Sequence, residues 1–128
     1  LIQIDTTKQD FEIKPDHQIL NKFGVFKKIR INPVDILLSQ KIGAFLSRKR
    51  IKGRDIYDIV YLYSLTKPDF LYLESKYKTG NKEQLKLKLE NRLKGLDLKV
   101  LTRDIEHFLI NKDKIEVIIK FSDFIKSL

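Results

Sequence analysis

The chain has 128 residues, of which 42% are hydrophobic and 34% charged, and its formal net charge is +9. This length is enough for one domain, and the hydrophobic share excludes a chain too polar to fold. The absence of cysteine excludes disulfides, thiolate zinc sites and cysteine nucleophiles. No run approaches the roughly 20 apolar residues of a membrane span, which excludes a membrane partner. We therefore expect a cytoplasmic protein.

Three short segments at the start of the chain predict β-strands. Residues 1–5 alternate between apolar and polar side chains, as in a strand with one buried face. Residues 11–14 are a second candidate, which Pro15 ends, and residues 24–31 are a third, which an Asn-Pro dipeptide ends. We therefore expect a strand region over residues 1–32.

Helical spacing replaces this alternation after the first third of the chain. Pro33 is suited to the start of a helix, which we expect over residues 34–48. Gly53 interrupts the pattern, and a second helix is expected over residues 54–65, ending before Pro68. The short connection predicts that these two helices lie antiparallel as a helical hairpin.

The second half of the chain also predicts helices. Residues 67–80 suggest a loop with a short helix, and Asn81 is suited to cap the following helix. The apolar stripe of that helix consists of Leu85, Leu89, Leu93 and Leu96. Thr102 is expected to cap a fourth helix that ends at Ile110. Residues 113–128 predict a fifth helix, although their apolar run is also compatible with a strand.

These segments together predict an α+β fold. Short N-terminal strands precede a helical region over residues 33–128, which is expected to form a bundle of about five helices. No internal repeat and no low-complexity linker divides the sequence. We therefore expect residues 1–128 to form a single domain or a fragment of one.

The expected helical hairpin places charged residues among apolar ones. When the first helix is stepped at about 100° per residue, Lys41 and Arg48 fall in its apolar arc. That arc also holds Val34, Leu37, Leu38, Ala44 and Phe45, whereas the opposite face holds Asp35, Ser39, Gln40, Gly43 and Ser47. On the second helix, Asp55 lies within the apolar side and Asp58 at its edge. Because an unpaired buried charge costs several kcal/mol, these groups must meet partners or water.

Two interpretations of these charges follow from the residues. In the first, the hairpin is held together by ion pairs, with Arg48 or Arg54 clamping Asp55 through bidentate geometry. In the second, the groups line a cleft that binds an anion, because a lysine is a frequent ligand of phosphate groups. Spacing alone does not choose between them.

The residues of this hairpin also carry a resemblance to a known family. The run Lys41-Ile-Gly-Ala44, with Arg48, Arg54-Asp55-Ile-Tyr57 and Asp58, resembles the K-x-x-A-x-x-x-R…R-D-x-x-D signature of AbiEii/AbiGii-type nucleotidyltransferases. These are toxins of bacterial toxin–antitoxin and abortive-infection systems, with a DNA polymerase β-like core. The resemblance extends over residues 1–65, because the first strand, which ends in Asp5, is similar to the carboxylate-bearing strand of the family.

The resemblance implies a function and a set of site residues. The reaction would transfer a nucleotide from a nucleoside triphosphate to an acceptor such as tRNA, with Mg²⁺ as cofactor. The implied catalytic residues are Asp5, Lys41 and Asp58, with Asp5 also a metal ligand. The implied substrate-binding residues are Lys41, Arg48, Arg54 and Asp55. The strand region would be the end of the nucleotidyltransferase sheet, and a cognate antitoxin is a further implied partner.

The sequence departs from the family at its start. Such enzymes carry a Gly-Ser turn followed by an Asp-x-Asp pair on a strand, and this sequence contains neither. It also contains no methionine and begins with Leu1. We therefore expect it to be the C-terminal portion of a longer protein, inactive alone because the main metal ligands are missing.

The net charge of +9 favours a polyanionic partner, with nucleic acid first. Lysines of the third helix and the segment before it cluster away from the leucine stripe and predict an RNA-binding surface. These residues are Lys78, Lys82, Lys86 and Lys88. A solvated lysine face is an equally ordinary interpretation. The alternative function is accordingly a basic helical module that binds RNA or protein, with a purely structural hairpin.

Overall fold

The computed structural model describes residues 10–106 and 115–128. The chain divides into two units, residues 1–33 and 34–128. The first contains two strands and the second contains helices, so the fold class is α+β as predicted. The strand predicted over residues 1–5 lies outside the described residues.

The first unit contains a β-hairpin. Strand β1, Asp16–Lys22, pairs antiparallel with strand β2, Val25–Ile31. Phe23 and Gly24 form the turn, and both have positive φ angles, 53° and 74°. A two-residue turn of this kind matches the twist of the two strands.

Among the residues that the structure describes, the predicted and observed strands agree in one case. The strand expected over residues 24–31 is confirmed as β2. The strand expected over residues 11–14 is wrong, because this segment has no regular structure and β1 begins only after Pro15. Strand β1 was not predicted, because its side chains are exposed on both faces and leave no alternating pattern.

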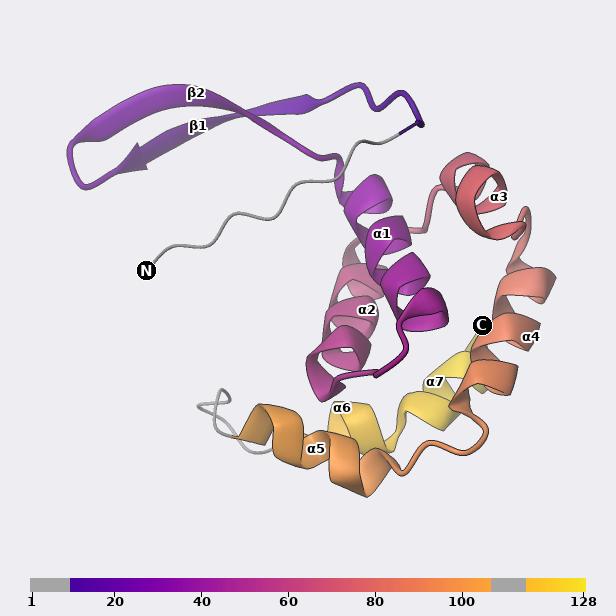
Figure 1. The fold of residues 1–128 in the computed structure, drawn as a ribbon. Helices are drawn as coiled ribbons and strands as arrows, with labels where there is room; N and C mark the ends of the chain where they lie inside the picture. The colour runs from indigo at the N-terminus through magenta and orange to yellow at the C-terminus, as the bar shows by residue number, and fades with distance from the viewer. Residues whose placement is uncertain (1–9, 107–114) are drawn as a thin grey trace. The chain divides into compact units, whose positions relative to one another are not determined.

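The second unit contains all the helices that the structure describes, and these are more numerous than the five predicted (Figure 1). They are α1 (Val34–Ser47), α2 (Gly53–Leu65), α3 (Phe70–Tyr77), α4 (Lys82–Leu93), α5 (Leu98–Glu106), α6 (Glu116–Ile119) and α7 (Phe121–Ser127). The antiparallel pair α1–α2 is at the centre of this unit, with α3 and α4 against α1 and with α5, α6 and α7 against α2. None of the described helices is long and apolar enough to cross a membrane.

The core of the second unit is formed by apolar side chains of all its helices. Phe45 of α1 contacts Phe121 of α7 edge to face, with ring centroids 5.5 Å apart. The other fully buried side chains include Leu38, Ile42, Ile56, Ile59, Leu73, Leu85, Leu89, Ile118 and Ile125. Burial of each side chain of this size contributes about 1.5–3 kcal/mol to folding, so the core fixes how the helices pack.

The helix starts show where local signals were correctly interpreted. Asn81 caps α4 as predicted, because its side chain accepts a hydrogen bond from the Gln84 N–H at 2.9 Å. The cap predicted at Thr102 is wrong. The Asp97 carboxylate accepts hydrogen bonds from the N–H groups of Lys99 and Val100, and α5 begins one turn earlier. The predicted end of this helix at Ile110 lies outside the described residues.

The C-terminal segment is helical, not a strand. The single helix predicted over residues 113–128 is two short helices, α6 and α7, which join at Lys120. The backbone of Lys120 leaves the helical region there, with φ −87° and ψ 9°. This change of direction places Ile118 and Phe121 in one core.

The predicted apolar face of α1 was partly wrong. Ser39 and Gly43, predicted to face outward, are buried, and Val34, predicted to face inward, is exposed. The helix is covered by α2 on one side and by α3 on another, so its buried surface is wider than one arc. Ser39 is satisfied in this position because its hydroxyl donates to the Asp35 carbonyl and accepts from the Asp69 N–H, both at 2.8 Å.

Candidate functional site

The charged residues of the α1–α2 hairpin form two ion pairs. Lys41 Nζ lies 2.7 Å from Asp58 Oδ2, and Arg48 Nη1 lies 2.6 Å from Asp55 Oδ1. Both pairs join α1, or the residue just after it, to α2. The ion pairs of the first interpretation are therefore present, with Arg48 as the partner of Asp55.

The Arg48–Asp55 pair is built into the start of α2. The Asp55 side chain is only 3% exposed. Its second oxygen accepts a hydrogen bond from the Lys52 N–H at 3.2 Å, one of the N–H groups that a helix start leaves without an intrahelical partner. The carboxylate also lies in the first turn, where a negative charge is favoured by the helix dipole. These contacts give Asp55 a structural role at the hairpin bend.

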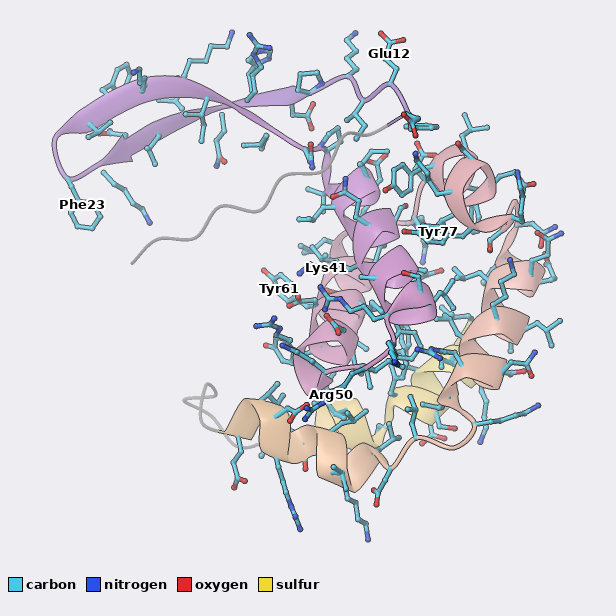
Figure 2. The ribbon with its side chains drawn as sticks, viewed as in Figure 1. Glu12, Phe23, Lys41, Arg50, Tyr61 and Tyr77 are labelled. Carbon is cyan, nitrogen blue, oxygen red and sulfur yellow. The ribbon has the colours of Figure 1, made fainter. Side chains whose placement is uncertain are left out.

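The Lys41–Asp58 pair is more accessible. The side chains of Lys41 and Asp58 are 37% and 35% exposed, in the middle of the hairpin. Figure 2 shows Lys41 beside the α1–α2 pair. A lysine ammonium has three hydrogen-bond donors, and Asp58 uses one of them, so two remain for an anion. The carboxylate thus positions the ammonium and leaves two of its hydrogen-bond donors available.

The predicted inward orientation of Lys41 and Arg48 needs correction. Both lie at the edge of the buried face, since the side chain of Arg48 is 45% exposed and that of Lys41 is 37% exposed. Arg54 does not clamp Asp55, because Arg48 does so. The Arg54 side chain is exposed and lines a cavity with Arg50, Lys52 and Asp104.

The four lysines predicted to bind RNA have different environments. Lys88 Nζ donates to the carbonyl oxygens of Tyr77 and Lys78, at 2.5 and 2.7 Å, and so satisfies the end of α3. Lys86 Nζ donates to the carbonyl of Lys126 at 2.6 Å. Lys82 is exposed at the start of α4, and Lys78 ends α3 in a left-handed conformation with φ 52°. Lys88 therefore has a structural contact in addition to its charge.

Three basic residues that the structure places near the hairpin were not singled out from the sequence. Arg92 of α4 donates to the carbonyl oxygens of Phe45, at 3.3 Å, and of Arg48, and so satisfies the end of α1. Arg50 and Lys52 line the cavity beside Arg54. The signal for these two was present, since residues 48–54 carry five basic side chains, but their convergence depends on the fold of the bend.

The described residues do not provide a complete metal site. Within residues 10–106 and 115–128, no group of three or more His, Asp or Glu side chains lies close enough together to hold a metal ion. Asp5, the one residue predicted to bind Mg²⁺, lies outside the described residues. Lys41 and Asp58 do not by themselves form a metal site, because one of the two is a cation.

No model of a protein family matches the chain, and neither does any curated protein or solved structure.

Proposed function

We propose that this chain is the C-terminal part of a nucleotidyltransferase of the abortive-infection or toxin–antitoxin type. It would transfer a nucleotide from a nucleoside triphosphate to an acceptor such as tRNA. The observation that carries the proposal is the accessible Lys41–Asp58 pair, which joins the first and last residues of the signature in the sequence. The buried Arg48–Asp55 pair, formed by two further residues of that signature, supports the same hairpin.

The chemistry of the pair suits the phosphate of a nucleotide. Lys41 would donate to phosphate oxygens through its two remaining N–H groups, and would neutralise negative charge that grows there during transfer. Asp58 would hold the ammonium in position. Because the pair is about one-third exposed, it contributes only about 0–1 kcal/mol to folding, so Lys41 can bind a ligand at little cost in stability.

The metal would be bound by residues other than those that the structure describes. The sequence contains neither a Gly-Ser dipeptide nor an Asp-x-Asp triplet, so on this proposal the main ligands of Mg²⁺ belong to protein outside this sequence. When bound, the ion would neutralise phosphate oxygens and lower the pKa of the acceptor hydroxyl. The fragment alone would be inactive.

The experiment is the Lys41→Ala variant of the complete gene product, assayed for transfer of labelled nucleotide to total tRNA. Loss of one preorganised donor to a developing charge should lower the transfer rate by about 100-fold or more. Because the pair is partly exposed, the free energy of unfolding should fall by less than about 1 kcal/mol. Urea unfolding of the same variant measures this second quantity.

The control is Lys120→Ala, which removes an exposed lysine that is also paired with a carboxylate, Glu116, at 3.3 Å. It should leave transfer unchanged. If Lys41→Ala instead unfolds the domain, or leaves transfer at the control level, the pair is structural. If the unmodified protein transfers no nucleotide, the binding-module interpretation is favoured.

A further inference from the structure

We propose that the cavity lined by Arg50, Lys52, Arg54 and Asp104 is a binding pocket for a phosphate group. Its volume is about 280 Å³. Arg50 and Lys52 belong to the connection between α1 and α2, Arg54 to the first turn of α2, and Asp104 to α5. Figure 2 shows Arg50 near the end of the α1–α2 pair that faces α5.

Within the part of the chain that the structure describes, the fold does not use the three cations of this pocket. All three are exposed, and within the described residues none of their side chains forms an ion pair or a hydrogen bond. This contrasts with Lys41 and Arg48, which are both paired. Three cations and one carboxylate line the pocket, so it has an excess of two positive charges, which favours an anion.

The backbone around the pocket is fixed by close packing. A Cβ atom added to Gly53 would lie 2.1 Å from the carbonyl oxygen of Leu101, so the start of α2 touches the backbone of α5 directly. Ile51 and Leu101 are both buried beside it. The backbone that carries the cations is therefore packed against α5, and the groups that a ligand would order are the side chains.

The chemistry of the lining selects the ligand class. Arginine guanidinium groups present planar donor pairs that match phosphate oxygens, and two of the three cations are arginines. The volume is near the lower end of the range for ligand pockets, about 300 Å³. That size suits a phosphate group with part of its substituent, and does not suit a large organic ligand.

The pocket lies one turn of α2 from the Lys41–Asp58 pair, and a joint role of the two in binding phosphate rests on the proposed function. Arg54 precedes Asp58 by one helical turn, so the two lie about 6 Å apart along the axis of α2. A chain of phosphates could therefore contact Arg54 and also Lys41, the partner of Asp58. The phosphate would come either from the triphosphate of the nucleotide or from the backbone of the acceptor RNA.

The test is calorimetric titration of the 128-residue chain with inorganic tripolyphosphate and, separately, with a single-stranded RNA oligonucleotide. The variant Arg50→Ala/Arg54→Ala should weaken binding of one probe at least tenfold. Asp104→Asn should tighten it about threefold, because it removes a repelling charge. Lys28→Ala/Lys99→Ala removes two exposed cations elsewhere and is the matched control. Circular dichroism and thermal melting of each variant show that it is folded.

The two probes separate the sources of the phosphate. A specific loss with tripolyphosphate assigns the pocket to the nucleotide, and a specific loss with RNA assigns it to the acceptor. An equal loss in the control variant, or no loss in the arginine variant, overturns the proposal. Since binding is measured without catalysis, the two proposals fail separately. Binding through this pocket in a protein whose complete gene product transfers no nucleotide would refute the proposed function alone.

Discussion

The carboxylate of Asp55 is almost fully buried, and both of its oxygens accept hydrogen bonds. In Asp55→Ala, α2 loses the contact to the Lys52 N–H, and Arg48 loses its partner. We expect the free energy of unfolding to fall by about 2–3 kcal/mol, between the cost of a lost helix cap and that of a broken buried ion pair. Urea unfolding followed by far-ultraviolet circular dichroism measures the change.

The control for Asp55 is Asp58→Ala on the same helix. Asp58 is 35% exposed, so solvent replaces part of its interaction with Lys41 and the loss should stay below about 1 kcal/mol. Equal losses at the two positions would mean that the burial of Asp55 contributes nothing to the strength of its pair.

Lys88 provides a second contrast between two similar side chains. Its ammonium donates to two carbonyls at the end of α3, where a positive charge also suits the helix dipole. Lys88→Ala should therefore lower the free energy of unfolding by about 1 kcal/mol. Lys82→Ala, at an exposed position of the same helix, should change it by less than about 0.5 kcal/mol. Urea titration of both variants decides whether Lys88 acts in folding or only as a surface charge.

The contact between α2 and α5 depends on Gly53. Because the carbonyl oxygen of Leu101 belongs to the backbone, it cannot move aside for a Cβ atom 2.1 Å away. Gly53→Ala should force the two helices apart and cost about 1–3 kcal/mol, as overpacking does. Thermal unfolding compared with the unmodified chain measures this.

Gly80→Ala is the matched control for Gly53. The atom nearest to an added Cβ there is the end of the Glu74 side chain, at 3.0 Å, which can rotate away. This variant should unfold near the temperature of the unmodified chain. A larger loss at Gly80 than at Gly53 would contradict the tight packing of α2 on α5.

The elements that the sequence predicted correctly are those with local signals. Helices α1 and α2 and the cap at Asn81 follow from proline, glycine and asparagine at particular positions, which act within a few residues. Strand β1 and the start of α5 do not. The first is exposed on both faces, and at the second Asp97 competes with Thr102 as a cap, a competition that packing of α5 on α2 decides.

For the site, the sequence predicted which charges matter better than it predicted their partners. Lys41, Arg48, Asp55 and Asp58 were identified because charges stood among apolar positions. Which arginine would bind Asp55 depends on the path of the bend at residues 48–52, which spacing along a helix does not describe. Predicting the cavity beside Arg54 required the same three-dimensional information, because Asp104 belongs to α5, a helix distant in sequence.

In the helical unit, packing changes the pKa of two tyrosines and so makes the stability of the fold depend on pH. Burial raises the pKa of Tyr63, whose ring lies edge to face with Phe124 of α7. Burial is also the main cause of the raised pKa of Tyr72. The neighbouring Tyr77 raises it further, while a hydrogen bond with Gln40 of α1 acts in the opposite direction. Both hydroxyls are therefore harder to ionise in the folded chain.

The consequence is a loss of stability in alkali. The unfolded chain releases both protons near pH 10, the folded chain only at higher pH, so the unfolded state binds fewer protons above about pH 10. The stability is therefore fully present below that pH and falls as pH rises through the folded-state pKa values. Urea midpoints measured at about pH 8 and about pH 11 should differ less for Tyr63→Phe/Tyr72→Phe than for the unmodified chain, since phenylalanine cannot ionise. Tyr61→Phe, at a ring that is 56% exposed, is the control. If it reduces the difference as much as the double variant does, burial of Tyr63 and Tyr72 is not the cause.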